Sequence, residues 1–235
     1  MAGLLTGQCA LVTGASRGIG AATAEALAAE GAHVILTART AGGLEEVEER
    51  IHLAGGSATI APLDLTEADS IGRLAVAVSE RWNVLDIMVL NAAMLGTLAP
   101  VPHIDAKEFA KVFTLNVIAQ QAMLAAFDPL LRKSANARVI GVTSSVGTAP
   151  RAFWGAYGAS KAAFEILLSS YGEENRNTKR VHVAIVEPGA TRTQKRALAY
   201  PGEDPATLKT PESVANAIIS LATSGFETGH RIRVN

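Results

Sequence analysis

Short apolar segments alternate with helical segments from one end of this 235-residue chain to the other. The apolar segments are rich in β-branched residues, which favour strands, and glycines at positions 31, 55 and 56 close two of the helical segments. This order predicts an α/β fold of three layers, in which helices cover both faces of a doubly wound parallel sheet. We expect about seven strands, at 8–13, 33–38, 57–62, 86–90, 138–143, 181–186 and 231–234. We expect the main helices at 19–30, 43–53, 67–82 with Thr66 as N-cap, 105–132, 154–175 and 211–223.

The composition fits such a sheet and excludes several other classes of protein. Hydrophobic residues make up 49% of the chain and charged residues 18%, as expected where a parallel sheet is buried on both faces. The net charge of −1 gives no basis for binding nucleic acid or a membrane surface. The five histidines lack ligand-like spacing, so we expect no metal site. The single cysteine, Cys9, is predicted to be a buried structural thiol.

No feature of the sequence divides the chain, so we expect one domain over residues 1–235. The N-terminus has no basic and apolar leader, and no apolar run has the length of a membrane span, which predicts a cytoplasmic protein. Residues 189–210 form the one long stretch without a regular pattern. Because long loops are usually functional, we expect this stretch to be a substrate loop that closes as a lid.

The segment Thr13–Gly20, TGASRGIG, follows the first expected strand and leads directly into the first helix. Gly14, Gly18 and Gly20 permit a tight turn in which the backbone approaches a pyrophosphate, and the helix N-terminus adds N–H groups and a positive dipole end. The spacing differs by one residue from the GxGxxG fingerprint, but the context is that of a Rossmann-fold dinucleotide site. A purely structural turn is the alternative.

The end of the second expected strand indicates which dinucleotide binds. NAD-binding folds commonly place an acidic residue there for the ribose hydroxyls. Here Ala38 occupies that place and Arg39 follows, so a guanidinium is available for the extra phosphate of NADP(H). Arg17, inside the glycine turn, adds a second positive charge. We therefore expect NADP(H), with NAD(H) and a merely solvated Arg39 as the alternatives.

A pair of residues suited to acid–base chemistry lies in the helix after the fifth expected strand. Tyr157 and Lys161 are four residues apart, which places them on one helical face. A nearby ammonium group lowers the pKa of a phenol from its ordinary value of about 10. A hydroxyl from Ser144 or Ser145 could bond an oxygen held against Tyr157. Such a set interconverts a carbonyl and an alcohol, although a Tyr–Lys pair at this spacing also arises by chance.

Together these motifs resemble the short-chain dehydrogenase/reductase family in its single-domain, Rossmann-fold form. The resemblance covers nearly the whole chain, in the family's order: TGASRGIG, LDL at 63–65, LNAA at 90–93, Asn116 in FTLNV, Ser144, YGASK and EPGATRT at 187–193. The combination is far more specific than any single motif. It implies an NADP(H)-dependent oxidoreductase that transfers hydride between the cofactor and a small-molecule ketone, aldehyde or 3-oxoacyl-like substrate.

The resemblance implies four catalytic residues. Ser144 is preferred over Ser145 because it precedes Tyr157 by thirteen residues, as the family's catalytic serine does. Tyr157 would be the acid and base. Lys161 would bind the nicotinamide ribose hydroxyls and lower the pKa of the tyrosine. Asn116 would hold a water that relays protons between Lys161 and solvent.

The resemblance also implies a cofactor-binding set. Asp64 would bond the adenine amino group, Asn91 would lie under the adenosine ribose, and Thr193 would bond the nicotinamide carboxamide. The full set expected at the cofactor is Gly14, Ser16, Arg17, Gly18, Ile19, Gly20, Arg39, Asp64, Leu65, Asn91, Ala92, Tyr157, Lys161, Pro188, Gly189, Thr191 and Thr193.

Two features depart from the family pattern. The family's Asn-Asn-Ala-Gly after the fourth strand is replaced by LNAA at 90–93, which keeps the central asparagine. The chain also stops at Asn235 after HRIRV, where many members continue with Asp-Gly-Gly and a tail that helps build subunit contacts. A homodimer through the two long helices and the family's common homotetramer are therefore both open.

Two other functions are open at this level. A non-enzymatic dinucleotide-binding sensor or scaffold on the same fold is the main alternative, although a sensor has no need for the Asn–Ser–Tyr–Lys set. Transient use of the nicotinamide, as in epimerases or dehydratases, is the least expected in so short a chain.

The substrate is not identified by the sequence. An apolar or aromatic pocket is predicted by Met94, Leu95, Phe153, Trp154 and Tyr200. Four basic residues either bind an anionic substrate or the cofactor phosphates, or form a solvated surface: Arg151, Arg192, Lys195 and Arg196.

Overall fold

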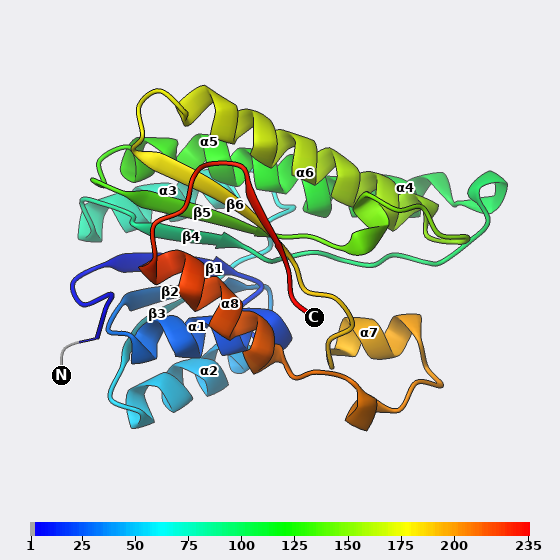
Figure 1. The fold of residues 1–235 in the computed structure, drawn as a ribbon, viewed down its shortest axis with the longest axis horizontal. Helices are drawn as coiled ribbons and strands as arrows, with labels where there is room; N and C mark the ends of the chain where they lie inside the picture. Colours follow the sequence, from blue (N-terminus) through cyan, green and yellow to red (C-terminus); the bar gives the residue numbers. More distant parts are fainter. Residues whose placement is uncertain (1–2) are drawn as a thin grey trace.

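The computed structural model describes residues 3–235, which form a seven-stranded sheet with helices on both faces (Figure 1). Met1 and Ala2 of the expected domain 1–235 lie outside the described residues. The strands run in the order β3-β2-β1-β4-β5-β6-β7, and each neighbouring pair is parallel. Their bounds are β1 Cys9–Thr13, β2 His33–Ala38, β3 Ser57–Pro62, β4 Ile87–Leu90, β5 Ala137–Val142, β6 Val181–Glu187 and β7 His230–Arg233. The predicted doubly wound α/β fold is confirmed.

The winding of the chain reverses between β1 and β4. β1 pairs with β2 on one side and with β4 on the other. In open α/β sheets, ligands bind beyond the carboxyl ends of the strands at such a point. The glycine turn after β1 and the loop after β4 meet there, so the topology places the predicted cofactor site at the carboxyl ends of these two central strands.

Two helical layers bury the two faces of the sheet in separate apolar clusters (Figure 1). One face is covered by α1 (Gly18–Ala29), α2 (Ala41–Leu53) and α8 (Pro211–Thr223). The other face is covered by α3 (Ser70–Arg81), α5 (Ala119–Leu131) and α6 (Gly155–Asn175). Because helices cover both faces, central strands such as β1 and β5 are buried along their whole length instead of alternating.

The helix predicted at 105–132 is continuous but not uniform. The carboxylate of Asp105 accepts a hydrogen bond from the N–H of Glu108 at 2.9 Å and caps α4 (Ala106–Phe113). A π-helical turn, Thr114–Ile118, then joins α4 to α5. Within the run Ala106–Leu131, an 18-residue window has a mean hydropathy of 1.2. By length and composition alone this helix could cross a membrane, contrary to our expectation from the sequence. Met123 and Phe127 of this run are fully buried, so part of its apolar character forms the core.

Two segments differ from the sequence predictions. α3 begins at Ser70, and Thr66 is not its N-cap. Instead, Thr66 donates hydrogen bonds from its N–H and its hydroxyl to the carboxylate of Asp64, at 2.8 and 2.7 Å, which stabilises a turn. The stretch 189–210 is also more regular than predicted, because Thr193 caps a short helix α7 (Gln194–Ala199) and a 3-10 turn covers Pro205–Thr207.

Candidate active site

The glycine turn after β1 has the backbone conformation that its sequence predicts. Gly14 and Gly18 have φ angles of 65° and 56°, in the left-handed region that favours glycine. A Cβ on Gly20 would lie 2.2 Å from the carbonyl oxygen of Gly14. Within residues 3–235, no side chain caps the N-terminus of α1, and Arg17 precedes it in an extended conformation. The turn therefore leaves backbone N–H groups for an anion, as a bound dinucleotide phosphate requires.

Hydrogen bonds between β1 and β4 hold the glycine turn in place. The side-chain amide of Asn91 donates to the carbonyl oxygens of Thr13 and Gly14, at 3.0 and 3.2 Å. The hydroxyl of Thr13 accepts hydrogen bonds from the backbone N–H groups of Asn91 and Ala92, both at 3.0 Å. Asn91 thus lies directly under the turn, and this support accounts for the asparagine independently of any contact with a ribose.

Arg39 and Asp64 come together at the ends of β2 and β3. A guanidinium nitrogen of Arg39 lies 3.9 Å from a carboxylate oxygen of Asp64, and the arginine side chain is 71% exposed. Partial burial of Asp64 opposes its ionisation, but the hydrogen bonds from Thr66 and the charge of Arg39 outweigh this effect and lower the pKa of Asp64. Leu65 is buried beside them. Although Arg39 pairs with Asp64, most of its side chain faces solvent and is accessible to a phosphate, which fits the preference for NADP(H).

The predicted catalytic serine, tyrosine and lysine lie where β5 meets α6. Ser144 follows β5 and precedes a 3-10 turn, Ser145–Gly147. This turn packs closely on α6: a Cβ on Gly158 would lie 2.8 Å from the carbonyl oxygen of Val146. Tyr157 and Lys161 are 5% and 2% exposed on the same stretch of α6. This close contact at Gly158 brings the turn after β5 against the helix that carries the tyrosine and the lysine.

The electrostatics of this pair differ from the sequence prediction. The ammonium of Lys161 donates a hydrogen bond to the carbonyl oxygen of Val142 at 2.9 Å, and it lies 5.9 Å from the centre of the Tyr157 ring. Burial raises the pKa of Tyr157, so the predicted lowering by Lys161 is not found. Burial and the charge of Lys195 lower the pKa of Lys161, against the opposing charge of Glu165.

Asn116 lies in the π-helical turn and is fully buried. Its side-chain oxygen accepts a hydrogen bond from the N–H of Met94, and its amide donates to the Met94 carbonyl oxygen and the Ser160 hydroxyl, all at 2.9 Å. The loop after β4 is thereby attached to α6 next to Lys161. Asparagine is unfavourable in the middle of a helix, and these hydrogen bonds explain why one is found at this position. The water relay stays a prediction.

The loop after β6 reaches back to the glycine turn. Gly189 has a φ of 64°, and the hydroxyl of Thr191 donates a hydrogen bond to the carbonyl oxygen of Pro188 at 3.0 Å. Thr193 accepts a hydrogen bond from the N–H of Arg196 at 3.2 Å. A Cβ on Gly18 would lie 3.5 Å from the methyl group of Thr193. Two motifs far apart in the sequence are thus in contact at the predicted cofactor site.

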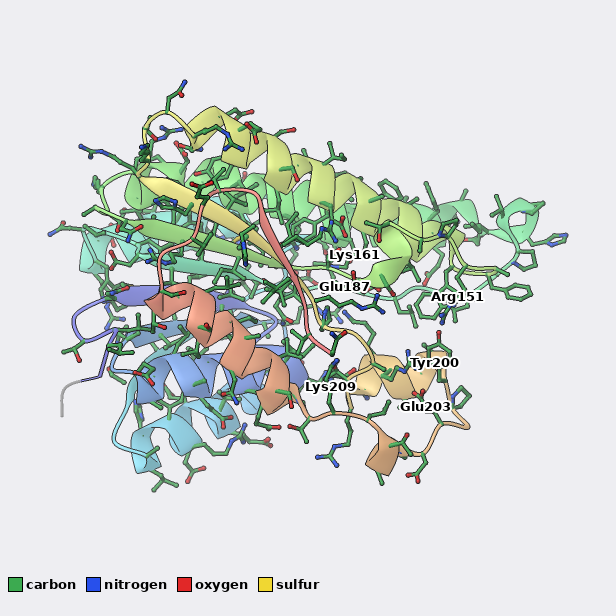
Figure 2. The ribbon with its side chains drawn as sticks, viewed as in Figure 1. Arg151, Lys161, Glu187, Tyr200, Glu203 and Lys209 are labelled. Carbon is green, nitrogen blue, oxygen red and sulfur yellow. The ribbon has the colours of Figure 1, made fainter. Side chains whose placement is uncertain are left out.

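Aromatic and charged contacts hold α7 beside the acid–base pair. The rings of Tyr157 and Trp154 are 5.9 Å apart, and those of Trp154 and Tyr200 are 5.8 Å apart. Arg196 stacks on Tyr200 at 3.7 Å and forms two hydrogen bonds with Glu203, at 2.6 and 2.5 Å. Figure 2 shows Arg151 and Tyr200 facing one another, and the guanidinium of Arg151 donates to the Tyr200 hydroxyl. The predicted pocket residues Trp154 and Tyr200 therefore lie together.

Sequence reasoning missed a carboxylate next to the predicted catalytic lysine. Glu165 lies four residues after Lys161 and is 6% exposed. Its carboxylate accepts hydrogen bonds from the hydroxyl of Thr143, at the end of β5, and from Arg231 on β7. The one signal in the sequence is a charged residue in an otherwise apolar stretch of α6 (SKAAFEILL), four residues after the lysine.

Known proteins resemble this chain in sequence and in fold. The family model described as short chain dehydrogenase matches residues 8–203. The uncharacterized oxidoreductase YciK of Escherichia coli K12 is 36% identical over 214 residues, which cover 90% of this chain and 84% of that protein. A rhamnolipids-biosynthesis 3-oxoacyl-[acyl-carrier-protein] reductase of Pseudomonas aeruginosa is 34% identical over an alignment of 254 residues, which covers 98% of this chain and 96% of that protein. A solved short-chain dehydrogenase of Shigella flexneri in complex with NADP is 34% identical, with a TM-score of 0.95 over 100% of this chain and 99% of that one.

Proposed function

Because this chain belongs to the short-chain dehydrogenase/reductase family and is an NADP(H)-dependent oxidoreductase, we propose that it interconverts a carbonyl and an alcohol with Tyr157 as acid and base. The observation that carries the proposal is the packing of the turn after β5 on α6, which brings Ser144 to the part of the fold that holds Tyr157 and Lys161. The oxidoreductase relatives favour this reading over a non-enzymatic sensor.

The residues of this chain would position the carbonyl and move one proton. Bound NADP(H) supplies or accepts the hydride. In the reducing direction, the hydroxyls of Ser144 and Tyr157 would donate hydrogen bonds to the carbonyl oxygen, and Tyr157 would protonate it as negative charge develops. Because burial raises the pKa of Tyr157, the phenol carries its proton at neutral pH and is ready to donate it. Lys161 would hold the ribose hydroxyls, and Asn116 would hold the water that returns the proton.

The cofactor would lie across the carboxyl ends of β1, β4 and β6. Its pyrophosphate would bind the N–H groups of the glycine turn, with Ser16, Arg17 and Ile19 around it. Arg39 would bind the extra phosphate of NADP(H). The adenosine would contact Asp64, Leu65, Asn91 and Ala92, and the nicotinamide would contact Pro188, Gly189, Thr191 and Thr193. The φ angles of Gly14 and Gly18, the close approach at Gly20 and the exposure of Arg39 support this fit.

Replacing Tyr157 by phenylalanine tests the assignment. Tyr157→Phe should lower kcat by about 10²- to 10⁴-fold, the usual contribution of general acid–base catalysis, and should leave the Kd for NADPH nearly unchanged. Tyr171→Phe is the matched control, because Tyr171 lies on the same helix and its hydroxyl bonds Asp128 at 2.7 Å. Substantial turnover by Tyr157→Phe on a carbonyl that the wild type reduces would contradict the proposal.

The substrate class and the subunit arrangement extend the proposal. The 3-oxoacyl reductase among the relatives favours a ketone or 3-oxoacyl group, and stretch 189–210 would cover it as a lid.

Ile118 and Ile166, on the two long helices, are 60% and 68% exposed, which supports a homo-oligomer that buries them. We expect a cytoplasmic protein. Light scattering should give a dimer or tetramer, and proteolysis within 189–210 should slow when NADPH and substrate are added.

A further inference from the structure

The four basic residues near the predicted pocket are not equivalent. Arg196 is paired with Glu203 and stacked on Tyr200, and Arg151 bonds the hydroxyl of Tyr200. Arg192 is exposed on the surface. Lys195 is different: it is half-buried, and its ammonium lies 5.9 Å from the centre of the Tyr157 ring. Within residues 3–235, no carboxylate lies within ion-pair distance of Lys195.

The position of Lys195 is fixed from both sides of α7. Thr193, two residues earlier, caps the helix and touches the glycine turn. Arg196, the next residue, is held by its stack on Tyr200 and its two hydrogen bonds with Glu203. Because the backbone on both sides of Lys195 is anchored, the Cα of Lys195 is held within side-chain reach of Tyr157.

Positive charge accumulates around Lys195 without a matching carboxylate. Two other cations interact with the charge of Lys195. Burial and the charge of Arg17 lower the pKa of Lys195 to about 8. After burial, the charge of Lys195 is the next cause that lowers the pKa of Lys161. The buried carboxylate of Glu165 is already bonded to Thr143 and Arg231. An excess of like charge in a shielded site favours an anion.

We propose that Lys195 binds an anionic group of the substrate a few bonds from the reactive carbonyl, so that the enzyme prefers short oxo acids to neutral ketones. The inference rests on the proposed function, which places the carbonyl oxygen at the Tyr157 hydroxyl. The same ammonium could instead meet a phosphate oxygen of the cofactor. A substrate anion is favoured because Lys195 lies over the Tyr157 ring, whereas the glycine turn has its own N–H groups and Arg17 for phosphate.

The test compares acetoacetate with its neutral ethyl ester, in wild type, Lys195→Met and Arg192→Gln. Arg192 is the control because it is an exposed cation on the same loop. Lys195→Met should lower kcat/KM for acetoacetate by about 10- to 100-fold, the effect of losing one charged hydrogen bond. The same substitution should change kcat/KM for the ester and the KM for NADPH by less than about 3-fold. In the wild type, the ratio of kcat/KM for acetoacetate to kcat/KM for the ester should fall above pH about 8, because the pKa of Lys195 is about 8 and the lysine then loses its proton.

Each of the other possible outcomes either supports or overturns the inference about Lys195. An equal loss for acid and ester with a raised KM for NADPH would assign Lys195 to the cofactor phosphates and overturn the inference. An unchanged ratio of acid to ester would also overturn it. If the wild type reduces neither probe, calorimetry of acetoacetate on the NADP⁺ complex decides: binding that Lys195→Met abolishes supports the inference, and no binding overturns it. The failure of Tyr157→Phe to lose activity would overturn the proposed function alone, since this binding test does not depend on it.

Discussion

Arg231, on the last strand, donates a hydrogen bond to the buried carboxylate of Glu165, one helical turn after Lys161. The C-terminal strand is thereby joined to α6, the helix that carries the predicted catalytic residues. The charge of Glu165 raises the pKa of Lys161 against the effect of burial. We therefore propose that Glu165 is a positioning residue, which acts on the proposed reaction through the lysine.

Glu165→Gln should move the pH profile of the enzyme. Removing the carboxylate lowers the pKa of Lys161, so the lysine loses its proton at a lower pH and the alkaline limb of kcat/KM shifts to lower pH. The free energy of unfolding should fall by about 1–3 kcal/mol, because Arg231 loses a charged partner. Glu174→Gln, at an exposed position on the same helix, is the control. A profile that superposes on that of the wild type would show that Glu165 is only structural.

Arg39→Asp should reverse or abolish the preference for NADP(H). The new carboxylate would repel the extra phosphate, and it would stand one residue after the place where NAD-binding folds put an acidic residue. We expect KM for NADPH to rise by about 10- to 100-fold, from the loss of one charged contact, and KM for NADH to change much less. Arg73→Asp, an equal change of charge at an exposed position on α3, is the control. An unchanged ratio of the two KM values would remove Arg39 from the cofactor site.

Gly20→Ala should weaken cofactor binding and destabilise the protein. The added Cβ would lie 2.2 Å from the carbonyl oxygen of Gly14 and 2.6 Å from the amide of Asn91, so the glycine turn must move. We expect a loss of about 1–3 kcal/mol in the free energy of unfolding and a Kd for NADPH raised at least about 10-fold. Gly42→Ala, in α2, meets no atom within 4 Å and should stabilise the helix slightly. Wild-type NADPH affinity in Gly20→Ala would contradict the role of the turn.

Cys9 should be unreactive in the folded protein. Burial and the charge of Asp86 raise the pKa of its thiol to about 12, so almost no thiolate exists at pH 8. A thiol reagent such as Ellman's reagent should therefore label the native protein far more slowly than the protein unfolded in guanidinium. Rapid stoichiometric labelling of the native protein would contradict the burial of this strand.

The sequence by itself determined the fold, the cofactor and the candidate catalytic residues. Strand and helix periodicity is local, so every strand was predicted to within one residue. The glycine turn is also local, because positive φ at Gly14 and Gly18 depends on the absence of a side chain. Tyr157 and Lys161 share a helical face through a spacing that the sequence displays directly. The same local reasoning failed at Thr66, where a hydrogen bond to Asp64 competes with helix capping.

Only the tertiary structure decided how these groups influence one another. Arg231 and Glu165 are 66 residues apart in the chain, and nothing local predicts that β7 delivers one to the other. The pKa of Tyr157 is raised because burial depends on everything packed around the ring. Lys195 belongs to a loop whose sequence fitted a solvated surface equally well. It lies over Tyr157 because Trp154, Tyr200 and Arg196 hold α7 there, and such a through-space arrangement has no signature in the order of residues.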